Sequence, residues 1–421
     1  MKLFSKIKPF FSKYRNVFIG SILLSVTVYF IVALVTKGRG FSFVFFKENQ
    51  DIFMDFFNSV RDASLRTGAY TERHVIYPPM ANLILWLISF ITPDAYNATE
   101  FEARGSWRNY PINIVLIVIL AVLSLAAFAA VIYGGLKAEK KYRLMITAAA
   151  VFSVPCLYMV ERGNMMVLAF VGLAIYAITY NSKSRIVREL GIIALAFSFS
   201  IKLYPIIFAW IMIADKRYKE FFRCALYSLA FLVIPSFFFG GPQCLWWIVK
   251  NIVSFSGTRH NVPWFLSAYA KIPEFVVSAV FYGFFALAAL SFLVAPFVHK
   301  ERWKVWAIGC IAFISYPALS STYGWSLFII PLIYLCNSGM DIDWYKVKSR
   351  MGYLIPMLIP FQFLALPMTA IARLVSPGFS GTLPTTANAV MVYVCILILS
   401  GYATFDTAKE TVKLIKTRKK K

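Results

Sequence analysis

Charged residues are scarce in this chain, and so are the sequence motifs of most soluble enzymes. Only 15% of the 421 residues are charged and 60% are hydrophobic, whereas soluble domains carry about 25% charged residues. The six cysteines include no CxxC pair, and the three histidines are too scattered to form a metal site. No P-loop, GxGxxG or HExxH motif is present. The chain is therefore too apolar for a water-soluble fold, and we expect neither a metal ion nor another cofactor.

Long apolar stretches fill most of the sequence and are separated by short charged segments. A bilayer core of roughly 30 Å needs about 20 apolar residues for one helical span, and by this measure the sequence predicts about 12 transmembrane helices. We therefore expect an all-α polytopic membrane protein in which residues 1–421 form a single membrane domain.

The basic residues are distributed unevenly between the two sides of this predicted bundle. With the N-terminus inside, the cytoplasmic pieces hold 29 of the 43 Lys and Arg residues. These pieces are 1–15, 136–143, 182–189, 215–223, 299–304, 341–350 and 405–421. Because cytoplasmic loops retain Lys and Arg, the bias predicts a multi-pass protein of the cell membrane with both termini in the cytoplasm. The net charge of +24 then indicates contact with anionic membrane lipids, chiefly through the tail, and no nucleic-acid partner.

The apolar segment 78–92 can be interpreted in two ways. If it crossed the membrane, most of the later basic loops would lie outside, against the orientation rule. We therefore expect a non-spanning helix within one large outer loop, 37–110. The alternative is an ordinary span that is compensated by a span missed elsewhere. A second outer loop is expected at 241–274.

The first outer loop contains an amphipathic segment. Its apolar residues recur at helical spacing, and its polar face carries Asp51, Asp55, Asn58 and Asp62, three or four residues apart. Because anionic lipids repel acidic side chains, we expect this face to line a protein cavity; the alternative is a solvated face with Asp51 as a helix cap. Asp55 is expected in mid-helix, where an Asp has no capping role, and its apolar neighbours would keep water away from it.

Two further polar sites interrupt apolar stretches on the predicted outer side. One is the short connection Glu161-Arg162-Gly163-Asn164, and the other is Lys202, which precedes Tyr204-Pro205. A turn-capping Arg and a snorkelling Lys would explain both sites structurally. Alternatively they form an anion site, because Arg binds phosphate oxygens in a fork and Lys adds a point charge. In the second outer loop, Arg259 and His260 are further candidates for such an anion.

The order of these motifs resembles glycosyltransferase family 87, of the GT-C class of polytopic transferases. The family's acidic residue after the first span is matched by Asp55, and its later Tyr-Pro-Pro by Tyr77-Pro78-Pro79. The mid-chain polar connection is matched by 161–164 and the Lys-x-x-Pro segment by 202–205. The resemblance covers roughly residues 15–335. It departs in the late outer turn, where some members carry His and this chain has 320–325, with Tyr323 in that turn.

The resemblance implies a GT-C-like bundle with juxtamembrane helices in the first outer loop. It also implies a mannosyltransferase-like enzyme that moves a hexose from a polyprenyl-phosphate-linked donor to a hydroxyl of an envelope glycan or glycolipid acceptor. Asp55 would be the catalytic base, and the donor phosphate would be bound by Arg162, Lys202, Arg259 and His260. The substrate pocket would include Asp51, Asn58, Tyr77, Glu161, Asn164, Tyr204 and Tyr323. Direct attack with one carboxylate base predicts inversion at the anomeric carbon, with no obligatory metal.

Two other functions use similar substrates. A lipid-linked oligosaccharide flippase or transporter would also have about a dozen spans, but such proteins usually show paired halves, and we see no internal symmetry. A polysaccharide polymerase would join lipid-linked repeats. Both remain alternatives to the transferase.

Overall fold

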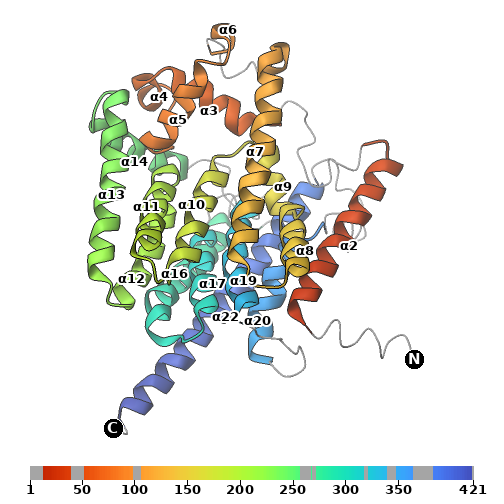
Figure 1. Cartoon of the computed structure of the whole chain (residues 1–421), viewed down its shortest axis with the longest axis vertical. Helices are drawn as coiled ribbons and strands as arrows, with labels where there is room; N and C mark the ends of the chain where they lie inside the picture. Colours follow the sequence, from red (N-terminus) through yellow and green to blue (C-terminus); the bar gives the residue numbers. More distant parts are fainter. Residues whose placement is uncertain are drawn as a thin grey trace. The chain divides into compact units, whose positions relative to one another are not determined.

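The computed structural model describes residues 13–38, 52–97, 106–256, 267, 272–316, 321–338, 348–363 and 383–419 (Figure 1). All regular elements within these ranges are helical, and no strand occurs among them. The all-α prediction is therefore confirmed. The chain divides into two compact units. Unit 1 comprises Met1–Lys47, Ile132–Tyr158 and Val262–Lys421, and unit 2 comprises Glu48–Val131 and Met159–Asn261.

Unit 2 contains the first-loop helices and the central helices of the chain. The first-loop elements are α3 Met54–Ser64, α4 Thr67–Thr71, α5 Pro79–Ser89, α6 Asp94–Asn97 and η3 Ser106–Asn109. They are followed by α7 Pro111–Gly135, most of which lies in this unit, and by α10 Met166–Thr179 and α11 Arg185–Ile201. The unit ends with η4 Tyr204–Ala209, α12 Trp210–Ala214, α13 Tyr218–Ser236, η5 Phe237–Phe239 and α14 Gln243–Ser256.

Helices α10, α11 and α13 pack side by side in unit 2, with α11 antiparallel to α10 and parallel to α13. The close approach of α10 and α11 depends on Gly172, because a Cβ there would lie 2.6 Å from the carbonyl oxygen of Ala194. Helix α11 begins after Ser184, whose hydroxyl accepts a hydrogen bond from the N–H of Val187, as expected for a Ser cap. Figure 1 shows α3, α4 and α5 gathered at one end of α13 and α12 at its other end.

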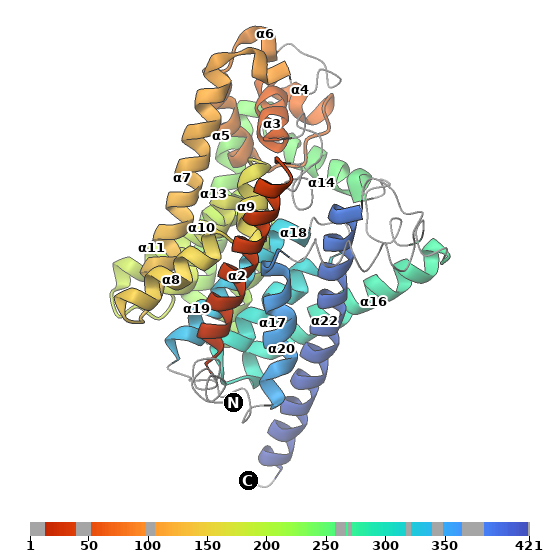
Figure 2. The same cartoon turned by 90° about the vertical axis from the view of Figure 1, so that its right-hand side faces the viewer.

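Unit 1 is built around α17 Arg302–Ile314, of which every residue after Arg302 is buried. Its other elements are α2 Tyr14–Val35, α8 Lys140–Val151, the first part of α9 Val154–Glu161, α16 Glu274–Val298, α18 Ser321–Gly324, η6 Trp325–Phe328, α19 Ile329–Asn337, α20 Lys348–Leu358, η7 Ile359–Phe361 and α22 Leu383–Arg418. Helix α22 packs against α16, α17 and α20, and its last turns extend past α20 (Figure 2). A buried ion pair joins Lys304 Nζ to Asp406 Oδ2 at 2.9 Å.

Five helices of the described residues are long and apolar enough to cross a membrane, or six if the bent pair α8–α9 counts as one span. They are α2, α7, α13 with η5, α16 and the part of α22 from Met391 to Arg418. The segment 78–92 forms α5, whose 11 residues are fewer than the roughly 20 of a full span. Several apolar helices, among them α10 and the η4–α12 segment, are also shorter than a span. A multi-span helical protein is supported, and the count of twelve stays a prediction.

Candidate functional site

The first-loop helix begins later than the sequence predicts. Phe53 has a left-handed backbone with φ of 58°, so α3 starts at Met54 and Asp55 lies in its first turn. The expectation that Asp55 occupies mid-helix is therefore wrong. The first turn has a structural use for an acidic residue, since the N-terminal end of a helix dipole favours negative charge. Asp51 lies outside the described residues.

The unusual backbone of Phe53 is held by the connection between α9 and α10. The Phe53 N–H donates to the carbonyl oxygen of Glu161 at 2.8 Å. Gly163 in the same connection has φ of +63°, and a Cβ there would lie 2.8 Å from both the Phe53 ring and the Cβ of Phe56. A left-handed non-glycine residue costs about 1–3 kcal/mol and persists only where its surroundings hold it. The connection therefore fixes the start of α3.

Asp55 is held by two side chains of this connection. Arg162 forms an ion pair with Oδ1, in which Nη2 contacts the oxygen and Nε donates at 3.1 Å. Asn164 donates from Nδ2 to Oδ2 at 2.8 Å. The N–H of Met166 donates to Asn164 Oδ1 at 2.9 Å, which fixes the orientation of the Asn164 amide. The Asp55 side chain remains 23% exposed, so the carboxylate is accessible from outside the protein.

Lys202 lies directly after the last residue of α11 and outside all candidate spans. Its ammonium group lies 4.2 Å from the centroid of the Tyr77 ring, within the range of a cation–π contact. Burial lowers the pKa of Lys202 to about 8, and the Asp55 carboxylate opposes that shift. Asp55 therefore acts electrostatically on Lys202, and the two polar sites of the sequence belong to one region of unit 2.

Tyr204 contacts the first residue of α10. Its hydroxyl contacts the sulfur of Met166, the residue whose N–H holds Asn164. On the other side, the carbonyl oxygen of Tyr77 accepts a hydrogen bond from the Tyr70 hydroxyl at 3.0 Å. Tyr77, Lys202 and Tyr204 are thus each positioned by contacts within unit 2.

The other predicted site residues have different positions. Asn58 is half-buried on α3, one turn after Asp55. Glu161 is half-buried, and its carbonyl oxygen is the acceptor of the Phe53 N–H. Tyr323 belongs to unit 1, where its ring stacks on Tyr158 with centroids 6.3 Å apart. Arg259 and His260 lie outside the described residues.

Asp62 has a local partner of its own. Its Oδ1 lies 3.1 Å from Nη2 of the adjacent Arg61. Burial raises the pKa of Asp62, and the charge of Arg61 opposes that shift. This pairing distinguishes Asp62 from Asp55, whose partners come from a connection more than 100 residues later in the chain.

Sequence reasoning did not identify the residues that support the site. Phe53, Gly163 and the N–H of Met166 position Asp55 and Asn164, and only the glycine in a polar turn gave a signal in the sequence. Within the described ranges, no group of three His, Cys, Asp or Glu side chains is arranged to hold a metal ion.

Comparison with protein families gives a match in the middle of the chain. Residues 75–249 match the model of glycosyltransferase family 87, which supports membership of that family and confirms the resemblance carried by the motif order. The match covers less than half of the chain, and it includes Tyr77, Arg162, Asn164 and Lys202 but not Asp55. No curated protein and no solved structure matches the chain.

Proposed function

We propose that this chain, whose match to glycosyltransferase family 87 supports a membrane glycosyltransferase, is a hexosyltransferase that uses a polyprenyl-phosphate-linked sugar. The sugar, which we propose to be mannose, passes to a hydroxyl of an envelope glycan or glycolipid with inversion. The observation that carries the proposal is the Asp55 carboxylate, held by Arg162 and Asn164 close enough to Lys202 to act on its charge.

One carboxylate is enough for this reaction. An ionised carboxylate offers about four acceptor positions, so Asp55 can accept a hydrogen bond from the acceptor hydroxyl while Asn164 and Arg162 keep their contacts. As the hydroxyl oxygen attacks the anomeric carbon, Asp55 takes its proton and the lipid phosphate leaves with the bonding electrons. Attack opposite the leaving phosphate inverts the anomeric configuration.

Positive charge beside the carboxylate suits the departing phosphate. Lys202 lies at the end of a helix with its ammonium group on the Tyr77 ring, and it is the phosphate-binding residue in this proposal. Arg162 adds charge on the other side of Asp55. Arg259 and His260 in the second outer loop remain proposed additional ligands of the phosphate.

The course of α10 and α11 supports placement of the reaction on the outer face. Asn164 precedes α10 and Lys202 follows α11, whereas the connection 180–184 between these helices lies at their opposite ends. That connection and the first turn of α11 carry Lys183, Arg185 and Arg188, and the nearby turn 215–219 carries three further Lys and Arg residues. Because basic segments stay in the cytoplasm, the ends that carry Asn164 and Lys202 are expected to face outward.

The proposal is tested by turnover of a radiolabelled polyprenyl-phosphate mannose by the purified full-length protein. Asp55→Asn is nearly isosteric and is expected to lower turnover by about 10²- to 10⁴-fold, since it removes the base. Donor binding should persist in this variant. Asp62→Asn is the matched control, because Asp62 pairs with its own neighbour, and it should retain activity.

Two results would contradict the proposal. Full activity of Asp55→Asn together with loss in Asp62→Asn would move the base to Asp62. Full activity of both variants, with movement of the donor across proteoliposome membranes, would favour the flippase.

A further inference from the structure

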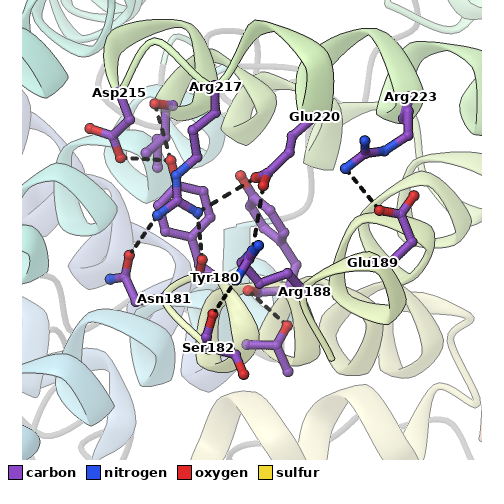
Figure 3. A network of polar contacts seen from close by, with 12 residues as sticks. Tyr180, Asn181, Ser182, Arg188, Glu189, Asp215, Arg217, Glu220 and Arg223 are labelled. Atoms are coloured by element: carbon purple, nitrogen blue, oxygen red, sulfur yellow. Dashed lines mark hydrogen bonds and ion pairs between the residues drawn. The ribbon is translucent and has the colours of Figure 1, made fainter. Parts of the chain in front are cut away.

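The polar network at the opposite end of unit 2 has no role in the proposed reaction (Figure 3). It joins the end of α10, the start of α11 and the turn before α13. Tyr180, the residue after α10, donates from its hydroxyl to Asp215 Oδ2 at 2.6 Å. Arg217 donates to the carbonyl oxygen of Tyr180 at 2.6 Å and lies over its ring at 4.3 Å. The network therefore holds the two connections against each other.

The carboxylates of this network are all occupied by internal partners. Glu220 lies 3.5 Å from both Arg188 and Arg217. Glu189 pairs with Arg223 at 2.9 Å and accepts a hydrogen bond from the Tyr227 hydroxyl at 2.7 Å. Three arginines are thus neutralised within the protein, and no acidic side chain of the network remains to balance other cations.

Four cations of the same two connections point outward without such partners. They are Lys183, Arg185, Lys216 and Lys219, and all four are exposed. None of them forms a side-chain hydrogen bond or ion pair with the residues that the structure describes. This surface therefore carries four uncompensated positive charges.

Exposed apolar rows begin directly beside these cations. On α11, Ile186 is 73% exposed and Leu190 is 56% exposed, one turn apart. On α13, the row consists of Tyr218, Phe222 and Leu226, with Phe222 70% exposed. Large apolar side chains in this position suit the acyl region of a bilayer, and cations at their edge suit the headgroup region.

We propose that this surface, formed by Lys183, Arg185, Lys216 and Lys219 with the adjacent apolar rows, binds the headgroups of anionic phospholipids. The lipid phosphates contact the four cations, and the acyl chains lie along α11 and α13. A soluble polyanion would use only the cations, whereas a phospholipid uses both features. Because α10 and α11 run from this surface to the Asp55 site, bound lipid would hold the end of unit 2 that lies away from the reaction.

The test measures retention of phosphatidylglycerol by the full-length protein in detergent micelles, with phosphatidylcholine as the neutral lipid and native mass spectrometry as the readout. The variant carries Lys183→Gln, Arg185→Gln, Lys216→Gln and Lys219→Gln. A basic residue near an anionic surface contributes about fivefold in binding, so the four changes should weaken phosphatidylglycerol binding by at least about tenfold, and by up to about 600-fold if their effects are additive. Phosphatidylcholine binding should not change.

The matched control removes four exposed cations of unit 1 outside the basic tail, with Lys137→Gln, Lys140→Gln, Lys141→Gln and Lys300→Gln. Equal loss in the control and the variant would overturn the proposal, because it would show a general effect of charge. If the variant does not fold, a wild-type titration with KCl decides the matter: phosphatidylglycerol binding should fall with salt, and salt-independent binding would overturn the proposal. Displacement of the lipid by millimolar inorganic phosphate would indicate a soluble-anion site instead and would also overturn it.

Discussion

At the scale of single residues, the charge of Lys202 is expected to change in the mildly alkaline range. Burial lowers its pKa to about 8, so the ammonium form is complete well below that pH and is lost as the pH rises through it. The polyprenyl-phosphate sugar is a phosphodiester and keeps one negative charge over this range. Donor affinity should therefore be constant below about pH 7 and fall by up to about tenfold per pH unit above about pH 8. A binding titration across this range measures the effect.

Lys202→Arg is the matched control for this prediction. An Arg stays charged throughout, so the affinity of this variant should not fall above about pH 8. Lys202→Ala should bind the donor about 10- to 150-fold more weakly at neutral pH, the usual loss for a hydrogen bond to a charged group. If Lys202→Arg shows the wild-type fall, another group controls the pH dependence.

Asn164 is a positioning residue, because it acts on the reaction through Asp55. Its Nδ2 donates to Asp55 while its Oδ1 is held by the N–H of Met166, so Asn164→Leu should release one side of the carboxylate. We expect kcat to fall by about tenfold or more with little change in KM, because a hydrogen bond to a charged group contributes about 1.5–3 kcal/mol.

Asn164→Asp separates positioning from a loss of folding. This variant places a second carboxylate opposite Asp55, and the pair can form a hydrogen bond only when the two groups share a proton. Its activity should therefore rise toward wild type as the pH falls, whereas the pH profile of Asn164→Leu should keep the wild-type shape. Identical profiles for the two variants would contradict a role in orienting Asp55.

At the scale of elements, the junction between α3 and the α9–α10 connection depends on Gly163. An alanine there would be strained at φ of +63° and would meet Phe53 and Phe56 at 2.8 Å. Gly163→Ala should destabilise unit 2 by about 1–3 kcal/mol and should also lower transfer activity, because the start of α3 carries Asp55. Thermal unfolding and turnover of the same preparation measure both effects.

Gly241→Ala is a control at another glycine of positive φ, without the close contact. Gly241 has φ of +90°, and a Cβ there would meet no atom within 4 Å. Its alanine variant should lose some stability yet keep its turnover once folded. A loss of turnover as large as in Gly163→Ala would show that backbone strain alone, and not contact with Phe53, is responsible.

The sequence predicted the elements better than their boundaries. The amphipathic pattern identified α3, but the start of the helix was placed too early because nothing in the pattern indicates a left-handed Phe53 held by Glu161. The apolar segment 78–92 was correctly expected to be helical, and its short length agrees with a helix that does not span. Helix limits of this kind are set by contacts with distant segments, which a local pattern does not contain.

For the candidate site, the sequence predicted some of the residues that the structure brings together but not their contacts. Polarity in apolar surroundings identified Arg162, Asn164 and Lys202, and the helical period identified Asp55. Their pairing could not be derived, because Asp55 and Arg162 are 107 positions apart in the chain. Arg162 was expected to bind the donor phosphate, but its partner in the structure is the Asp55 carboxylate.

At the scale of the whole molecule, orientation in the membrane decides which substrates the site meets. Helix α11 has 17 residues and a length of about 25 Å, and it separates Lys202 from the basic end at Arg185. Such a distance approaches the thickness of a bilayer core. The two ends of unit 2 are therefore expected in the two different headgroup regions, with the Asp55 site outside.

Cysteine labelling tests this orientation together with the interpretation of α5. The native cysteines among the described residues are buried or half-buried, and a variant without them removes any background. Glu72→Cys and Asp94→Cys place exposed thiols before and after α5, and Lys216→Cys places one at the basic end. A membrane-impermeant maleimide added to intact cells should modify positions 72 and 94, and position 216 only after permeabilisation.

Because the 11 residues of α5 extend only about 16 Å, they are too short to carry the chain across a core of roughly 30 Å. Modification of position 94 only after permeabilisation, with position 72 accessible, would show that α5 spans the membrane and that the large outer loop is wrong. Modification of position 216 in intact cells would reverse the orientation and move the proposed reaction to the cytoplasmic face.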